Sequence, residues 1–207
     1  MKKFLTLLAA LCVLTASLML SACGASGLSE DEIRTTVQSL VEQSYVLNDV
    51  YYGDGLPYTK DDAILEELLG VSPDDDGLVL DYYPVTADAA FQSEDEIRAA
   101  TNAVFSPAMC EMLFEIAFQG VSTEDESRVA FARFLQQGDY LTVRVDLAED
   151  AVDVGRTYDF SKMTVLIDEA ERIRVELPSE ADGKPSVNVR ITIIKTADGW
   201  RLDSPTY

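Results

Sequence analysis

The stretch Val187–Asp203 reads VNVRITIIKTADGWRLD, and its first half alternates apolar with polar side chains. Alternation with a period of two residues is typical of a β-strand with one buried and one solvated face. Asp198-Gly199 favours a tight hairpin turn between two strands. We therefore expect the chain to return after this turn as an antiparallel strand in which Trp200 and Leu202 face inward.

The same alternation recurs through much of the C-terminal half. It predicts strands near 129–135, over 141–147, around Val165, and over 172–177 and 187–193. Apolar residues share one face of these strands, whereas arginines recur on the other. An antiparallel meander with one buried and one solvated face fits this pattern.

Helical signals occupy the N-terminal half. The sequence SEDE, at 29–32 and again at 93–96, forms a capping box, in which serine and glutamate side chains satisfy free backbone amides at a helix start. Helices are predicted over 30–51, 59–69, 93–105 and 106–119. Helices followed by antiparallel strands indicate an α+β fold in which the helices cover the apolar face of a curved sheet. We expect residues 29–207 to form a single domain of this class.

The N-terminus carries a targeting pattern. Two lysines at positions 2 and 3 precede an uncharged apolar run over 4–20, which has the proportions of a signal peptide. The LSAC that follows at 20–23 resembles the lipobox of bacterial lipoproteins. That resemblance implies cleavage between Ala22 and Cys23, acyl chains on the Cys23 thiol, and attachment to the extracytoplasmic face of the cell membrane.

This interpretation divides the chain into a signal peptide over 1–22, lipid attachment and a short tether over 23–28, and the folded domain. Two alternatives stay open. One is an ordinary secretory signal, and the other is a retained membrane helix, although no basic stop-transfer cluster follows Gly24.

The amino-acid composition excludes several classes of catalytic site and ligand. The 207 residues include no histidine, 16 basic and 37 acidic residues, and have a formal net charge of −21. The lack of histidine removes Ser–His and Cys–His nucleophile pairs and the zinc sites that depend on imidazole. Nucleic acid is an unsuitable partner, because phosphate binding needs a basic surface.

The acidity is uneven along the chain. Residues 24–100 carry 18 acidic and three basic side chains, against 19 and 11 over 101–207. A strongly negative helical half favours a cationic partner, such as a basic envelope protein or peptide. The alternative is that this acidity only keeps the domain soluble.

The order of these elements is similar to the nuclear transport factor 2-like, or cystatin-like, superfamily. Two short stretches, DGWRLDSPTY at 198–207 and YGDGL at 52–56, look like segments of small extracytoplasmic lipoproteins from Firmicutes-type bacteria. Some of those proteins resemble the inhibitor of peptidoglycan DL-endopeptidases. The resemblance implies a cone of helices on a curved sheet, in which the superfamily's enzymes place an Asp or His base. No motif here marks such a residue, so we assign no catalytic residue and no cofactor.

The candidate partner-binding residues are Tyr51, Tyr52, Asp54 and Tyr58, in and beside a Gly-Asp-Gly turn. Glycines permit unusual backbone angles, and tyrosines supply rigid, amphipathic contact area. Together they favour a recognition loop. Equally open is a helix C-terminus whose tyrosines pack on the rim of the sheet.

Three other features favour structural roles. The acidic run over 74–77 would place Tyr83 where a calcium-binding EF-hand needs a bidentate glutamate, so we expect a solvated turn and no metal site. Cys110 lies in an apolar helical pattern and is expected to be buried. The carboxylates over 146–153 are expected in a solvated loop.

Two functions fit these patterns. The first is a non-catalytic binding or regulatory lipoprotein that docks a basic, wall-associated partner through its acidic helical face and the tyrosine loop; an inhibitor of a wall hydrolase is one version of it. The second is a small-molecule pocket protein, or an isomerase- or hydratase-like enzyme. That function requires a buried carboxylate or tyrosine lining an apolar cavity between helices and sheet.

Overall fold

The computed structural model describes residues 24–69, 81–122, 129–146, 155–181 and 183–207. Its helices are α2 (Glu30–Tyr51), α3 (Asp62–Leu69), α4 (Glu94–Val104) and α5 (Pro107–Phe114), with a π-helical turn at Glu115–Gln119 and a 3-10 turn at Phe160–Lys162. Its strands are β1 (Tyr82–Pro84), β2 (Val121–Ser122), β3 (Val129–Ala130), β4 (Phe134–Gln137), β5 (Tyr140–Arg144), β6 (Thr157–Tyr158), β7 (Thr164–Glu169), β8 (Arg172–Leu177), β9 (Ser179–Ala181), β10 (Lys184–Pro185), β11 (Val189–Thr196) and β12 (Gly199–Leu202).

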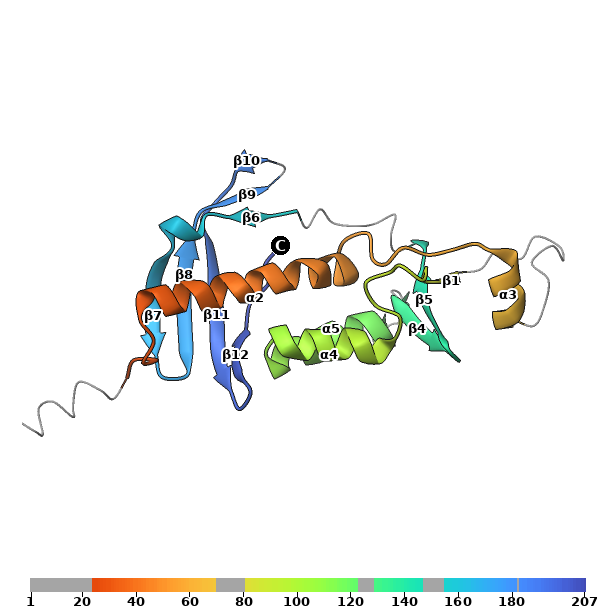
Figure 1. The fold of residues 1–207 in the computed structure, drawn as a ribbon, viewed down its shortest axis with the longest axis horizontal. Coiled ribbons are helices and arrows are strands. Elements are labelled where there is room, and N and C mark those ends of the chain that lie inside the picture. Colours follow the sequence, from red (N-terminus) through yellow and green to blue (C-terminus); the bar gives the residue numbers. More distant parts are fainter. Residues whose placement is uncertain (1–23, 70–80, 123–128, 147–154, 182) are drawn as a thin grey trace, which may run out of the picture.

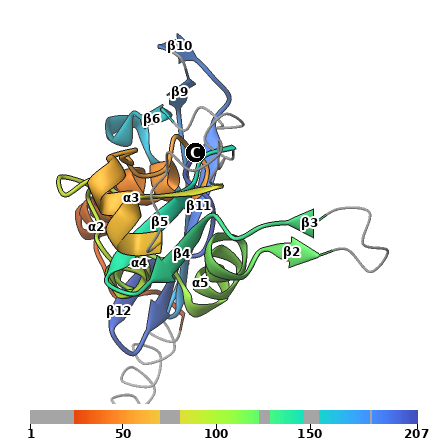
Figure 2. The same ribbon diagram turned by 90° about the vertical axis from the view of Figure 1, so that its right-hand side faces the viewer.

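The arrangement is α+β, as the sequence predicts (Figure 1). Strands β12, β11, β8 and β7 form a four-stranded antiparallel sheet in that order, while β1-β5-β4 and β10-β9-β6 form separate three-stranded sheets. The expected single meander is therefore wrong, because the β4–β5 hairpin pairs with β1 rather than with β7. Alternation defines which face of a strand is buried, but it does not identify the neighbouring strand. A further pair, β2 and β3, projects from the body (Figure 2).

Helix α2 begins at the predicted capping box. The Ser29 side chain accepts a hydrogen bond from the Glu32 amide, and the Glu32 carboxylate accepts one from the Ser29 amide at 2.8 Å. Apolar residues at helical spacing, among them Ile33, Val37 and Leu47, are buried. The helix runs along the four-stranded sheet and extends toward the β1-β5-β4 sheet (Figure 1).

Two helices differ from their predicted extents. Helix α3 begins at Asp62 rather than near Thr59, because the Asp61 side chain accepts hydrogen bonds from backbone amides of its first turn. Helix α5 is α-helical only to Phe114, and the π-helical turn that follows ends with a 3.0 Å hydrogen bond from the Gly120 amide.

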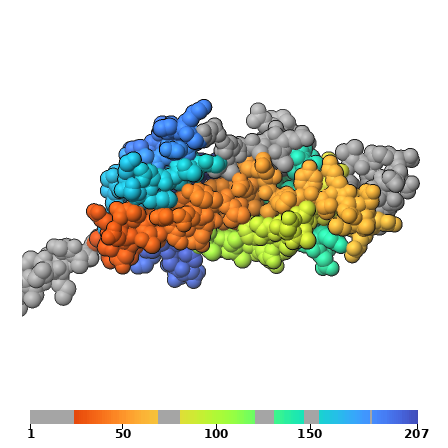
Figure 3. Space-filling view, turned by 45° about the horizontal axis from the view of Figure 1, so that its top comes forward, coloured from red at the N-terminus to blue at the C-terminus, as the bar shows by residue number. Residues whose placement is uncertain are grey.

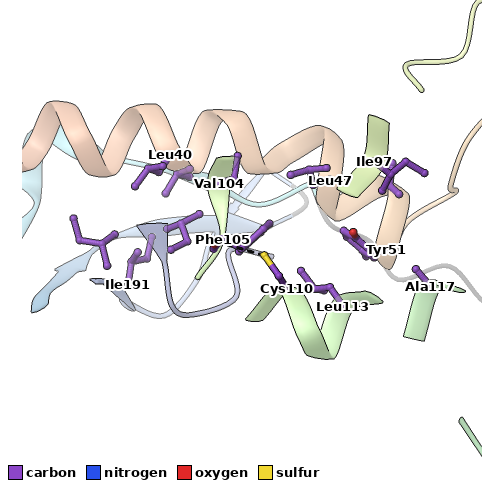
Figure 4. Packing of buried hydrophobic residues seen from close by; sticks show 14 of the residues in the cluster. Leu40, Leu47, Tyr51, Ile97, Val104, Phe105, Cys110, Leu113, Ala117 and Ile191 are labelled. Atoms are coloured by element: carbon purple, nitrogen blue, oxygen red, sulfur yellow. Dashed lines mark hydrogen bonds between the residues drawn. The ribbon is translucent and has the colours of Figure 1, made fainter. Parts of the chain in front are cut away.

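One hydrophobic core joins the helices to the sheets (Figure 4). Leu40 and Leu47 of α2 belong to it, as do Phe105 and Ile191. Cys110 is buried in this core, as predicted, with its thiol 3.5 Å from the Phe105 carbonyl oxygen. Because the thiol is buried, its pKa is raised, so it behaves as a small hydrophobic group.

In the closing hairpin, the two side chains predicted to face inward do face the core. Leu202 is fully buried, and Trp200 is partly buried and packs against the core. The strand before it begins at Val189, two residues later than predicted, and Val187 is 73% exposed. An apolar residue at the solvated end of an alternating run therefore does not extend the strand.

The described part of the molecule is elongated (Figure 3). The start of α2 lies with β7 and β8 at one end, and α3 lies with the β1-β5-β4 sheet at the other (Figure 1). The Ser26 amide donates a hydrogen bond to Asp168 Oδ1 of β7 at 2.9 Å. Ser26, which precedes α2, is thereby attached to the β7 end.

Candidate functional site

The residues that follow α2 fold around a buried arginine. The Gly53 amide bonds the Asn48 carbonyl at 3.1 Å, which ends the helix. The guanidinium of Arg133, only 7% exposed, donates to the carbonyls of Tyr51 and Gly53. Carbonyls at a helix C-terminus lack intrahelical partners, and the helix dipole favours a cation there. Burial lowers the pKa of Arg133, and the charge of Asp54 opposes that effect.

Gly55 completes this turn with a φ of +79°. A Cβ atom at this position would lie 3.2 Å from Arg133 Nη2. Glycine is therefore needed both for the backbone conformation and for the close approach of the guanidinium. The turn therefore depends on Arg133. The strand-like sequence around Arg133 contains no motif that would identify this role.

The four predicted partner-binding residues do not share one surface. Tyr51 is 2% exposed, with its hydroxyl hydrogen-bonded inside the core, so it is a packing residue and is not available to a partner (Figure 4). Tyr52 is half-buried and stacks on Tyr207, with ring centroids 4.2 Å apart. Only Asp54 and Tyr58 are exposed. These two residues lie in the segment that connects α2 to α3.

Tyr58 belongs to a small aromatic cluster. Its ring centroid lies 5.7 Å from that of Tyr83, and Lys60 Nζ lies 5.0 Å from the Tyr83 centroid and 5.9 Å from that of Tyr58. Such cation–π contacts hold the ammonium group over the rings. Lys60 is the one basic residue over 53–68, so the only cation of this segment contacts the rings of Tyr58 and Tyr83.

Carboxylates gather at the same end of the molecule as α3. Five exposed residues make up what we call the acidic end: Asp61, Asp62, Glu66, Glu67 and Asp139. The first four lie in α3 or just before it, and the fifth lies in the β4–β5 turn. Neighbouring charges of one sign create a potential that concentrates cations, over a screening length of about 8 Å at physiological salt.

A cavity of about 390 Å³ lies between α3 and the β4–β5 turn. We call it the α3 notch, and its lining residues are Glu67, Leu68, Gln137, Gly138, Asp139 and Tyr140. None of these residues is basic. The Glu67 carboxylate raises the pKa of the Tyr140 hydroxyl, first by hydrogen bonding to it and then by its charge.

A smaller cavity of about 180 Å³ lies between α2 and the residues that begin β6. Its lining residues are Tyr45, Asp49, Gly155, Arg156 and Thr157. Tyr45 and Asp49 are four residues apart and so lie on one side of α2. Burial raises the pKa of Asp49, and the charge of Asp54 adds to the shift.

Several predicted positions lie outside the described residues. They include Ala22 and Cys23, the predicted cleavage and lipid-attachment positions, and the acidic run over 74–77. Of the carboxylates over 146–153, the structure describes Asp146, which is exposed and accepts a 2.7 Å hydrogen bond from Arg144. Asp146 therefore lies at the surface, as expected.

Three further observations concern metal sites, membrane-spanning helices and buried charges in the described ranges. Within them, no three His, Cys, Asp or Glu side chains are grouped so as to bind a metal ion. No helix in these ranges combines the length and the apolar character that crossing a membrane requires. Their buried charged side chains are Arg133 and Arg144.

Two features of this surface have chemistry that a ligand could use. One is the α3 notch within the acidic end, and the other is the cavity between α2 and β6. Comparison of the chain with protein-family models, with curated proteins and with solved structures finds no match.

Proposed function

We propose that this chain is a non-enzymatic lipoprotein of the cell envelope that binds a cationic protein or peptide at its acidic end. The lipobox-like LSAC at 20–23 supports a lipid on Cys23 and a location on the extracytoplasmic face of the membrane. The partner is a basic, wall-associated protein, and inhibition of a wall hydrolase is one form that such binding takes.

The α3 notch is the observation that carries this proposal. Glu67 and Asp139 line one cavity that has no basic lining residue. A lysine or arginine side chain entering it would form charge-assisted hydrogen bonds with these carboxylates. The Tyr140 hydroxyl adds a further polar group, and Leu68 offers apolar surface to the aliphatic stem of the entering side chain.

The position of the tether supports the same function. Ser26 is bonded to Asp168 of β7, at the end of the molecule opposite α3 (Figure 1). With a lipid on Cys23, the acidic end is directed away from the bilayer. The partner then meets the notch without competition from the membrane surface, whose anionic headgroups attract basic segments.

The finer fold assignment is part of this proposal. We infer a cone of the nuclear transport factor 2-like, or cystatin-like, type. The capped helix α2 along an antiparallel sheet, and the closing strand Gly199–Leu202, support it. This assignment implies binding at the surface or within the cone, but it identifies no catalytic residue.

Binding of a basic peptide to the full-length protein in mild detergent tests the proposal. The probe is a fluorescent oligolysine, followed by fluorescence anisotropy at low and at high salt. The double variant Glu67→Lys and Asp139→Lys is expected to weaken binding about tenfold or more, because like charges then face the peptide. Added salt is expected to weaken binding to the unmodified protein.

A matched double variant, Glu42→Lys and Glu171→Lys, changes the net charge by the same amount at exposed positions outside the notch. It is expected to weaken binding much less. Equal weakening by the two double variants would show that overall charge, not the notch, attracts the peptide. Failure of the unmodified protein to bind oligolysine at low salt would overturn the docking function.

A small-molecule pocket protein, or an isomerase- or hydratase-like enzyme, is the second candidate function. The cavity between α2 and β6 favours it, because Asp49 and Arg156 line the same small space. Burial raises the pKa of Asp49, which brings a carboxylate closer to the range useful for general acid–base chemistry.

A further inference from the structure

The cavity between α2 and β6 presents two opposite charges that do not pair with each other. Asp49 belongs to α2 and Arg156 precedes β6, which runs beside this helix (Figure 1). None of the ion pairs among described residues joins them, so their charged atoms are more than 4.0 Å apart. Opposite charges that share a cavity without touching are complementary to a ligand that carries both.

Arg156 is held through one nitrogen of its guanidinium. Its Nη1 donates to Ser179 Oγ at 2.8 Å and to Ser186 Oγ at 3.3 Å. Its Nε is buried and has no hydrogen-bond partner among the described residues. A buried donor without an acceptor costs about 1–3 kcal/mol. The hydrogen bonds of Arg156 among the described residues are made by Nη1, so Nη2 is the donor that remains for a ligand carboxylate.

Asp49 is a carboxylate that lacks a cationic partner within the described ranges. Its carboxylate has no basic partner among the ion pairs of the described residues, and both its burial and the nearby charge of Asp54 disfavour the ionised form. An ammonium group placed in the cavity would offset both effects. Tyr45 supplies a ring and a hydroxyl on the same wall of the cavity.

We propose that this cavity binds a free α-amino acid, with the ligand carboxylate on Arg156 and the ligand ammonium group on Asp49. Its volume of about 180 Å³ suits one such molecule. Drug-sized ligands occupy pockets of about 300–1,000 Å³. The α3 notch is a separate cavity, so this assignment does not depend on docking of a basic partner; it gives the second candidate function its ligand class.

The surroundings leave room for a side chain on the ligand. Thr157 lines both this cavity and a neighbouring one of about 530 Å³ beside the β9–β10 hairpin. Glu180 and Lys162 line the neighbouring cavity, with Lys162 bonded to Asp159 at 2.8 Å. A ligand side chain that passes Thr157 would meet the polar residues of this neighbouring cavity.

Titration of the full-length protein in mild detergent tests this proposal, by calorimetry and by thermal unfolding. The probes are glycine, L-alanine, D-alanine and L-glutamine, and the comparators are acetate and ethylamine, which carry only one of the two charges. At least one amino acid is expected to bind saturably and to raise the unfolding temperature. Each comparator is expected to bind about tenfold or more weakly. Absence of binding by all four amino acids, or equal binding of a comparator, would overturn the proposal.

Variants locate the binding. Asp49→Asn changes only the charge of an exposed side chain and is expected to weaken binding about tenfold or more. Arg156→Lys keeps a positive charge but loses the planar guanidinium and its Nη2 donor, and a similar loss is expected. Asp198→Asn makes the same chemical change as the first variant at an exposed turn outside the cavity, so affinity is expected to be unchanged.

Arg156 also holds the β9–β10 hairpin through Ser179, so Asp49→Asn is the decisive variant. Unaltered affinity in a folded Asp49→Asn protein would refute the assignment. Oligolysine binding at the α3 notch, measured on the same samples, is expected to be unchanged. Failure of amino-acid binding is thereby distinguished from failure of the docking function.

Discussion

Replacing Thr206 with valine is expected to loosen the contact between the segment after β12 and helix α2. Thr206 is fully buried, with its Oγ1 2.6 Å from Ser44 Oγ and 2.9 Å from Asn48 Nδ2. The Ser44 hydroxyl hydrogen is directed to the Val41 carbonyl at 2.7 Å. The Thr206 hydroxyl therefore donates to Ser44 and accepts from Asn48.

Valine keeps the shape of the threonine side chain but removes both hydrogen bonds. Ser44 keeps its bond to Val41, whereas the Asn48 amide is left as a buried donor without that acceptor. The loss of one net hydrogen bond and the orphaned donor together cost about 2–3 kcal/mol. In a domain of this size each kcal/mol lowers Tm by about 2–4 °C, so we expect a fall of roughly 5–10 °C.

Urea unfolding and thermal unfolding, both followed by circular dichroism, measure this loss. Thr206→Ser keeps the hydroxyl and removes one methyl group, and is expected to cost about 1 kcal/mol or less. Thr35→Val removes an exposed hydroxyl on the same helix and is expected to change stability by less than about 0.5 kcal/mol. If Thr206→Val is as stable as the unmodified protein, or Thr206→Ser loses as much as Thr206→Val, the buried hydrogen bonds do not anchor this segment.

Gly55→Ala is expected to lower the free energy of unfolding by about 1–2 kcal/mol because of the positive φ, and by a further amount because the new Cβ would clash with the buried guanidinium. Gly138→Ala also has a positive φ but open space around it, so its loss in urea unfolding should be smaller. Equal losses in the two variants would rule out the clash. The pKa of Glu32 is lowered by hydrogen bonds in its capping box, so its ionised form stabilises the fold above the usual carboxyl pKa, and that contribution is lost as pH falls through the lowered value. Glu32→Gln is thus expected to be less stable than the unmodified protein near neutral pH and equally stable in acid, and a difference independent of pH would contradict this reasoning. Cys23→Ala is expected to abolish labelling by an alkyne fatty acid and to release the protein from membranes, whereas Cys110→Ala should still be labelled; labelling of the Cys23→Ala protein would place the lipid elsewhere.

Parts of this fold were predictable because their signals are local. The repeated SEDE sequence begins α2 and α4 within one residue of the predicted positions, since in both helices the serine side chain accepts a hydrogen bond from the amide three residues later. The full capping box forms at α2, whereas at α4 the Glu96 carboxylate accepts from the Gln92 amide rather than from that of Ser93. Asp198-Gly199 likewise joins β11 to β12, because a hairpin turn depends on the residues within it.

Sheet pairing was less predictable. The pairing of β1 with β5 joins Tyr82 to Arg144, and helices α4 and α5 and the paired strands β2 and β3 lie between them in the sequence. The alternating pattern of β5 is equally compatible with several neighbours, because it records only which face is buried. The sequence therefore predicted the last hairpin and the α+β class, but not the division into separate sheets.

The sites divide in the same way. The sequence offered Tyr51, Asp54 and Tyr58 alike as candidate binding residues and did not distinguish their exposure. The structure exposes Asp54 and Tyr58 and makes Tyr51 a core residue of α2. Arg133, which shapes the turn after α2, is 80 residues from the Gly53 carbonyl that it binds. No local pattern relates two positions so far apart.

By itself, the sequence determined where α2, α4 and α5 begin, where the last hairpin turns and how acidic the chain is, because caps, turns and charge are properties of neighbouring residues or of the whole composition. Only the tertiary structure decided that Glu67 shares a cavity with Asp139, and Asp49 with Arg156. These groups come from distant segments, and the packing of helices against sheets is what brings them together.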